Sequence, residues 1–134
     1  MQTTVTYMAR KYELLPGQVI KAGVRKLFRI RALRDFGDVR AGDIGGYIEN
    51  ELNLSHDGNA WVFGDARVFG DAQVYGNAQV SGNAWVFDNA QVFDNAQVSD
   101  NAWVSDNARV SGRAWVSGRA WVSDNAQVSG NARR

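Results

Sequence analysis

The sequence has no cysteine, one histidine and one proline, and each shortage excludes a class of protein. Without cysteine there is no disulfide framework, no thiolate zinc site and no cysteine nucleophile. A single histidine, His56, removes most histidine-based metal binding and acid–base chemistry within one chain. One proline against 14 glycines argues against a proline-rich or collagen-like chain, and a 45% hydrophobic fraction is too high for a disordered one.

The chain also lacks a long apolar run, so the sequence predicts neither a membrane span nor a secretory signal. Its 134 residues are the length of one domain. The net charge of +1 conceals an uneven distribution, because residues 1–40 carry +6 and residues 41–134 carry −5. Such polarity can orient a molecule toward a partner or a copy of itself, although a solvated basic cap beside an acidic body is the simpler interpretation.

From residue 58 the chain repeats every six residues without a slip. The units read GNAWVF, GDARVF, GDAQVY, GNAQVS, GNAWVF, DNAQVF, DNAQVS, DNAWVS, DNARVS, GRAWVS, GRAWVS, DNAQVS and GNARR. Ala and Val lie two apart and share one face of a strand, whereas the residues beside them point outward. Gly or Asp followed by Asn, Asp or Arg suits a corner. Since one unit cannot bury its valine alone, the pattern predicts the stacked coils of a parallel β-helix.

The same frame extends back to residues 46–48 and 52–54, with a two-residue insertion at 55–58 that we expect to form a bulged corner. One apolar residue in each unit is then predicted to face inward: Ile48, Leu54, Val62, Val68, Val74, Val80, Val86, Val92, Val98, Val104, Val110, Val116, Val122 and Val128.

Residues 1–45 do not follow the repeat and predict a β-rich basic cap over the first coil, ahead of a repeat domain at 46–134. Residues 3–7 are typical of a short strand, and residues 19–33 of a hairpin with Gly23 in its bend. We expect the apolar side chains of its second strand to face inward and the arginines between them to face water: Phe28, Ile30 and Ala32 against Arg29 and Arg31.

The repeated A-x-V units resemble the hexapeptide-repeat proteins, and residues 34–48 with Leu54 and Ser55 are similar to the lead-in of a phage and prophage branch of that family. The resemblance implies an all-β fold, a left-handed parallel β-helix with three strands and 18 residues per coil, and about 4–5 coils below an N-terminal hairpin cap. Many members of the branch are described as acyltransferases. The resemblance also implies a homo-oligomer in the bacterial cytoplasm, with a trimer as the first expectation and an end-to-end dimer as the second.

Because nothing interrupts the repeat after residue 58, positions 18 apart stack and the outward residues sort into three sides. Side two displays a ladder of three tryptophans, and exposed aromatic ladders indicate an interface. The predicted interface residues are Trp85, Trp103, Trp121, Arg67, Phe69 and Phe87 on side two, with Trp61 and Trp115 on side one. The alternatives are that the indoles only stiffen the sheet, or that they bind flat ligands, sugars or bases. Nucleic acid is the weaker expectation because the repeat domain is acidic.

A column of acidic residues, Asp88, Asp106 and Asp124, follows side two at one corner. Carboxylates about 5 Å apart repel each other and can attract a hard cation such as calcium, which makes the column a candidate metal site. The interpretation that we favour is that Asp and the Asn after it form good turns.

The resemblance raises two enzyme classes. Zinc-dependent carbonic anhydrases of this fold need three histidines per metal, which this chain lacks unless several copies share one. The acyltransferases use a histidine as general base beside coenzyme A, and His56 is the only candidate. No long loop between the repeats builds an acceptor pocket, so the sequence favours a protein without catalysis or cofactor.

We therefore expect a non-catalytic interaction module that self-associates. The resemblance implies that it comes from a phage or prophage accessory gene and binds, or inhibits, a host protein. The alternatives are an acyl-CoA-dependent acyltransferase and a structural component of a phage fibre or tip. Neither a membrane nor a nucleic acid is an expected partner.

Overall fold

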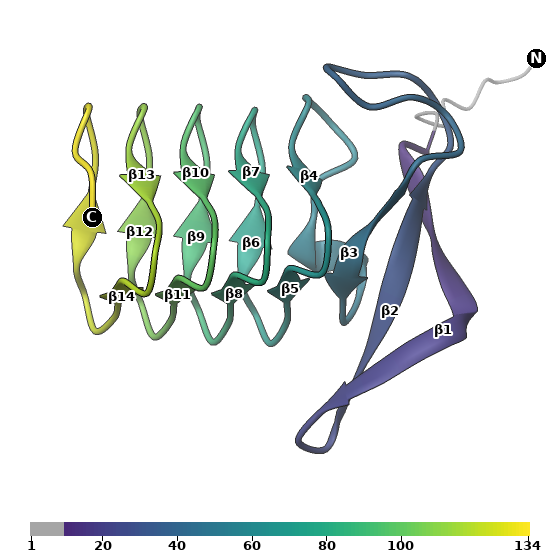
Figure 1. The fold of residues 1–134 in the computed structure, drawn as a ribbon, viewed down its shortest axis with the longest axis horizontal. Coiled ribbons are helices and arrows are strands. Elements are labelled where there is room, and N and C mark those ends of the chain that lie inside the picture. Colours follow the sequence, from purple (N-terminus) through teal and green to yellow (C-terminus); the bar gives the residue numbers. More distant parts are fainter. Residues whose placement is uncertain (1–9) are drawn as a thin grey trace, which may run out of the picture.

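The computed structural model describes residues 10–134 as a β-solenoid of about five turns, with parallel coils stacked along one axis (Figure 1). This confirms the all-β architecture that the repeat predicts, while the left hand of the winding stays an expectation from the resemblance. The predicted strand at residues 3–7 lies outside the described residues. Within the described part, no helix is long and apolar enough to cross a membrane.

Each coil contributes short strands to three sheets, which form the three sides of the solenoid. Side one contains β4 (Trp61–Val62), β7 (Gln79–Val80), β10 (Gln97–Val98) and β13 (Trp115–Val116). Side three contains β6 (Gln73–Val74), β9 (Gln91–Val92), β12 (Arg109–Val110) and β15 (Gln127–Val128). Side two contains β5 (Arg67–Val68), β8 (Trp85–Val86), β11 (Trp103–Val104) and β14 (Trp121–Val122), and it continues into β3 (Ile44–Ile48), β2 (Arg25–Ala32) and β1 (Tyr12–Ala22).

The strand pairing confirms the predicted register. Trp85 pairs with Trp103, and Trp103 pairs with Trp121, each 18 residues further along the chain. The first coil is longer, because Leu54 pairs with Val74 at a separation of 20 residues. The predicted two-residue insertion after Leu54 is thereby confirmed.

The interior is a narrow column of alanine and valine. All fourteen predicted inward residues are at most 4% exposed, with Val122 the most accessible of them. Burial of each valine contributes about 1.5–3 kcal/mol. Since this core is only a few side chains wide, the backbone hydrogen bonds between successive coils contribute much of the stability of the solenoid.

A short 3₁₀ helix, η1 (Glu51–Asn53), lies in the first coil between β3 and Leu54. The buried Asn53 side chain donates from Nδ2 to the carbonyl of Ala72 at 2.9 Å, and its Oδ1 accepts the Glu49 amide at 2.9 Å. The Asn53 amide itself donates to Asn50 within the 3₁₀ turn, so its side chain replaces the backbone pairing with the next coil.

Each corner needs a residue with left-handed backbone, and Gly or Asp occupies that position. Asp100 has a φ of 59°, close to the 63° of Gly82 one coil earlier. A side chain in this conformation is strained, but the Asp100 carboxylate accepts the Gly118 amide of the next coil at 2.9 Å. The same bond joins other successive corners, with donor before acceptor: Asp106 to Asp88, Gly112 to Asp94 and Asp124 to Asp106.

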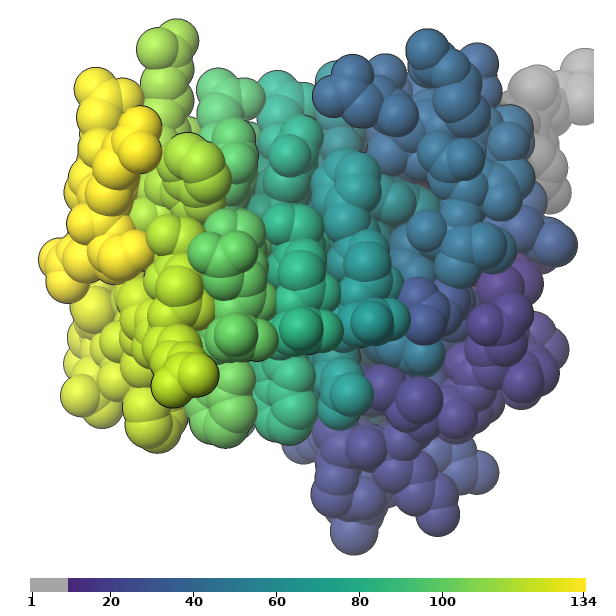
Figure 2. Space-filling model, viewed as in Figure 1, coloured from purple at the N-terminus to yellow at the C-terminus, as the bar shows by residue number. Residues whose placement is uncertain are grey.

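The cap is an antiparallel hairpin of β1 and β2, with Gly23 in the bend at a φ of 64°, as predicted. β2 pairs with β3, and β3 pairs in parallel with β5, so the cap extends the sheet of side two. Figures 1 and 2 show that the hairpin continues well beyond the coils, on the side where β5, β8, β11 and β14 lie. It therefore covers the first coil and also projects past it.

The structure corrects the expected alternation in β2. Leu27 is buried and Phe28 only half-buried, because the pairing with β3 shifts register between Arg29 and Arg31. Arg29 does not face water, since its guanidinium lies over the ring of Tyr47 at 4.2 Å. The remaining predictions for this strand are confirmed, with Ile30 and Ala32 buried and Arg31 exposed.

The corner bond generates a first prediction. Asp100→Ala keeps the left-handed backbone but removes the oxygen that accepts the Gly118 amide, so we expect it to lower the free energy of unfolding by about 1–2 kcal/mol. Asp100→Asn keeps an acceptor oxygen in a residue that tolerates this conformation and should cost less than half as much. Urea denaturation measures both variants. Equal stabilities of the alanine and asparagine variants would contradict the role of the carboxylate.

Candidate functional site

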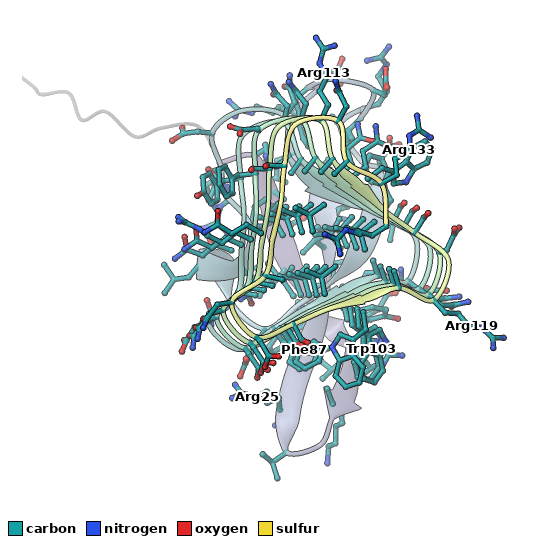
Figure 3. The ribbon with its side chains drawn as sticks, turned by 90° about the vertical axis from the view of Figure 1, so that its left-hand side faces the viewer. Arg25, Phe87, Trp103, Arg113, Arg119 and Arg133 are labelled. Atoms are coloured by element: carbon teal, nitrogen blue, oxygen red, sulfur yellow. The ribbon has the colours of Figure 1, made fainter. Side chains whose placement is uncertain are left out.

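Six of the predicted interface residues come together on side two. Parallel pairing of β5, β8, β11 and β14 stacks their outward side chains, and the residues after Val68 and Val86 extend the stack sideways. Figure 3, viewed along the solenoid, shows Phe87 and Trp103 pointing outward from this side. We call this surface the aromatic face and define it as Arg67, Phe69, Trp85, Phe87, Trp103 and Trp121.

The first coils of the aromatic face are closely stacked. The Arg67 guanidinium lies over Trp85 at 5.2 Å, and the indoles of Trp85 and Trp103 are 4.9 Å apart and nearly parallel at 6°. Beside them Phe69 and Phe87 stack at 5.2 Å. Phe69 is only 8% exposed, which corrects its assignment to an open surface, and it supports the face from below. Stacking therefore accounts for the order of these rings, as the alternative interpretation of the ladder proposes.

The stack breaks at Trp121. This indole meets Trp103 edge-on, at 5.5 Å and 75°, and its Nε1 donates to Ser105 Oγ at 2.9 Å. It remains 63% exposed. A hollow of about 460 Å³ opens beside the two indoles, bordered also by Asn101, Arg119 and Ala120. An exposed indole next to an apolar hollow is typical of a binding surface and is not explained by internal stacking.

Two of the predicted interface residues lie elsewhere. Trp61 is only 1% exposed, which corrects its assignment to an open surface, because the cap covers the first coil on side one. Its indole packs edge-on against Phe36 at 5.2 Å and Tyr12 at 6.2 Å. Trp115 is 38% exposed on side one, where its Nε1 donates to Ser99 Oγ at 3.0 Å. Trp61 thus belongs to the core, and Trp115 to a different side from the aromatic face.

The acidic column borders the aromatic face at the corner after side two, and we call Asp88, Asp106 and Asp124 the Asp corner. The carboxylates of Asp88 and Asp106 each accept a backbone amide of the following coil, at 3.2 and 3.0 Å. Among residues 10–134, no group of three or more histidine, aspartate or glutamate side chains is arranged to hold a metal ion. The hydrogen bonds at this corner are those of a turn. Calcium binding stays a prediction, and no arranged group of carboxylates among the described residues supports it.

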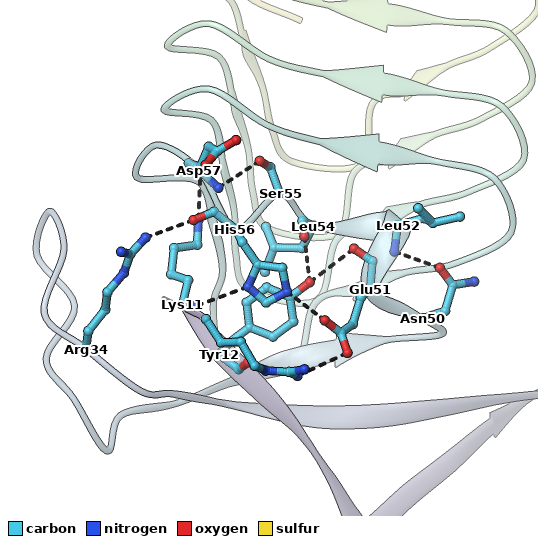
Figure 4. A network of polar contacts seen from close by, with 11 residues as sticks. Lys11, Tyr12, Arg34, Asn50, Glu51, Leu52, Leu54, Ser55, His56 and Asp57 are labelled. Carbon is cyan, nitrogen blue, oxygen red and sulfur yellow. Dashed lines mark hydrogen bonds and ion pairs between the residues drawn. The ribbon is translucent and has the colours of Figure 1, made fainter. Parts of the chain in front are cut away.

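His56 lies at the junction of cap and first coil (Figure 4). Its Nδ1 accepts the Lys11 amide at 3.0 Å, so the ring proton sits on Nε2 and is directed at Glu51 Oε1 at 2.7 Å. The ring stacks on Tyr12 with centroids 4.1 Å apart. Although partial burial raises it, hydrogen bonds from His56 and Arg10 hold the pKa of Glu51 below its ordinary value. With both ring nitrogens engaged, His56 has no free nitrogen to act as a general base.

Beside His56 the junction buries two polar residues that sequence reasoning missed. Lys11 is fully buried, and its Nζ donates to the carbonyl of Ala60 at 2.7 Å. The hydroxyl of Tyr12, also buried, donates to the carbonyl of Leu54 at 2.5 Å, and burial raises the pKa of this phenol. These side chains satisfy carbonyls at the start of the solenoid, where no earlier coil can do so. Nothing in the local sequence distinguishes Lys11 from a surface lysine.

Comparison with protein families agrees with this architecture. Residues 60–118 match a family described as the YdcK beta solenoid repeat, in overlapping segments at 60–76, 72–86, 78–93, 90–106, 96–112 and 102–118. No curated protein matches the chain. The chain is therefore a β-solenoid repeat protein, and the matched segments include four of its five tryptophans: Trp61, Trp85, Trp103 and Trp115.

The buried lysine predicts a pH dependence of stability. Burial, with repulsion from Arg34, lowers the pKa of Lys11 from 10.5 to about 8, against the attraction of Asp57. Between about pH 8 and pH 10 the unfolded chain therefore binds more protons than the folded one, and Lys11 makes the free energy of unfolding rise with pH. The rise cannot exceed about 1.4 kcal/mol per pH unit for one proton. Urea denaturation of the natural chain and of Lys11→Met isolates this slope, and identical slopes in the two proteins would contradict it.

The contacts of His56 predict a structural role. His56→Ala leaves the Lys11 amide and the Glu51 carboxylate without this partner, so we expect the free energy of unfolding to fall by about 2–3 kcal/mol. Gln127→Ala, at an outward position of side three, is the control and should cost less than about 0.5 kcal/mol. Acetyl-coenzyme A turnover is measured on the same proteins. Turnover by the natural chain that His56→Ala abolishes without loss of stability would favour the transferase alternative.

Proposed function

We propose that this β-solenoid repeat protein is a non-catalytic interaction module that self-associates and binds a protein partner through the aromatic face. The observation that carries the proposal is the end of the ladder, where Trp121 is 63% exposed beside the hollow that it shares with Trp103. Tryptophan is among the commonest anchors of protein interfaces, and a concave apolar surface beside it offers a place for a partner's side chain.

The scaffold suits such a role because its outward side chains are held by backbone pairing on both sides. Trp103, for example, lies on a strand that pairs with β8 and β14, and its ring is fixed against Trp85. Ordered side chains lose little conformational entropy when a partner binds. The aromatic face is therefore preorganised for binding.

Catalysis is the weaker candidate on the same evidence. The only histidine has both ring nitrogens engaged within the cap junction. The hollow beside Trp121 is lined by an asparagine, an arginine, an alanine and two tryptophans, without a carboxylate or histidine that could serve as a base. A second copy of the chain is the first partner to consider, since homo-oligomers are the commonest assemblies. An origin in a phage accessory gene and a host protein as a further partner belong to the proposal through the family resemblance alone.

The proposal predicts that Trp121 is an anchor of the assembly. Trp121→Lys places a charge in the apolar contact, so we expect it to weaken self-association by at least about 2 kcal/mol, or roughly 30-fold in Kd. Gln127→Lys changes the matched outward position of side three in the same coil and should leave association unchanged. Light scattering over a concentration series gives the mass of each variant, and circular dichroism checks the fold. An assembly that survives Trp121→Lys as well as Gln127→Lys would show that the ladder serves only to stiffen the sheet.

A further inference from the structure

The hairpin of the cap overhangs the aromatic face. β2 pairs with β3 only as far as Phe28 opposite Ile48, whereas β1 and β2 stay paired with each other out to Ala22 opposite Arg25. From Phe28 to Arg25 the free part of the hairpin is about 10 Å long at a strand's rise per residue, before the turn is counted. In Figures 1 and 3 this part descends past the side that carries Phe87 and Trp103. Two packed sheets also lie about 10 Å apart, so the tip can reach a second sheet laid against the aromatic face.

The tip is basic and has an apolar apex. Val24 is 100% exposed, and Lys21 and Lys26 are exposed on either side of it. Arg25 forms an ion pair with Glu49 at 2.8 Å, but among residues 10–134 neither lysine has an acidic partner. Two cationic groups and an exposed valine are thus presented at the end of a projecting element.

At the C-terminal end of the solenoid, the aromatic face is bordered by the acidic residues of the Asp corner. Asp106 and Asp124 follow the outer strands of side two, and within the described residues neither carboxylate pairs with a basic side chain. The charge of the whole chain has the same polarity, with +6 on residues 1–40 and −5 on residues 41–134. A second copy therefore carries both the basic tip and the acidic corner that complement this one.

Strand direction decides which groups can meet. β2 runs antiparallel to β3, and β3 runs parallel to β5, so the hairpin tip lies toward the end of side two at which the Asp corner follows the strands. A two-fold axis parallel to the strands lays two aromatic faces together with their coils in opposite order and keeps this end in place. Each basic tip then faces the Asp corner of the partner's last coils. An axis parallel to the solenoid would instead keep the coils in the same order and reverse the strands, so each basic tip would face the partner's first coil at the end opposite its Asp corner.

We propose that the chain forms a two-fold dimer in which the hairpin tip of each copy, residues 21–26, docks on Asp106, Asp124 and the exposed Trp121 of the other. Lys21 and Lys26 pair with the carboxylates, and Val24 packs beside the indole. The inference rests on the proposed function, because it assumes that the aromatic face is the surface of self-association. To the proposed function it adds which segment of the partner docks, the two-fold symmetry of the assembly and the number of copies, which is two.

Cysteine cross-linking tests the contact directly, because the natural chain contains no cysteine. The variants Val24→Cys and Ser123→Cys place one thiol at the tip and one beside Asp124, and each is mixed in equal amounts with the other under mild oxidation. We expect a disulfide-linked pair in the mixture, since the two positions meet across the dimer. Ser117→Cys is the matched control, because Ser117 ends an identical GRAWVS unit on side one. A mixture that links no more than the Ser117→Cys control overturns the docking.

Charge reversal gives a second, independent measurement. The double variant Lys21→Glu with Lys26→Glu should raise the dissociation constant of the dimer at least tenfold. The control, Arg113→Glu with Arg134→Glu, has the same change in charge and should have a smaller effect.

Light scattering decides between two and three copies, and a trimer overturns the two-fold arrangement. If Trp121→Lys dissociates the assembly while neither cross-linking nor charge reversal has an effect, the proposed function stands and the hairpin contact is wrong. If Trp121→Lys has no effect, the proposed function itself fails.

Discussion

Hydrogen bonding between successive coils is the constraint on which the rest of this structure depends. Backbone amides pair with carbonyls of the next coil, as from Trp103 to Ala120 at 2.9 Å, and the pattern recurs along the solenoid. This pairing converts spacing along the chain into columns across the surface. One added residue within the repeat would shift every later side chain by a position, so the aromatic face and the Asp corner exist only because residues 58–134 keep their period.

The two parts of the molecule solve the problem of buried polar backbone in different ways. Inside the solenoid each coil satisfies its neighbour, and the core needs only alanine and valine. No earlier coil supplies amides to the first coil, so Lys11 and Tyr12 donate side-chain hydrogen bonds to its carbonyls. Asn53 donates from its side chain to the carbonyl of Ala72 in the second coil. Burying the lysine charge is costly, which its lowered pKa reflects, but leaving those carbonyls unpaired would also be costly.

The proposed function depends on two properties of the molecule, the rigidity of its coils and the uneven distribution of its charge. The coils hold their outward groups in place, while the hairpin carries positive charge away from the body. A polar, elongated molecule with complementary ends favours antiparallel association over a parallel one. The aromatic face would supply most of the affinity in such an assembly and the charged groups its orientation, which is the usual division between apolar anchors and rim charges.

The sequence by itself determined the coils, their register and the inward residues, because a strict period of six admits one way to bury every valine. It also predicted the bend at Gly23 and the column of Trp85, Trp103 and Trp121. It did not determine which tryptophans are covered, since Trp61 and Trp115 occupy the same outward position on side one and the cap packs against Trp61. The edge-on turn of Trp121 and the double engagement of His56 were likewise decided by the tertiary structure, because both depend on contacts between residues far apart in the chain whose geometry no local pattern specifies.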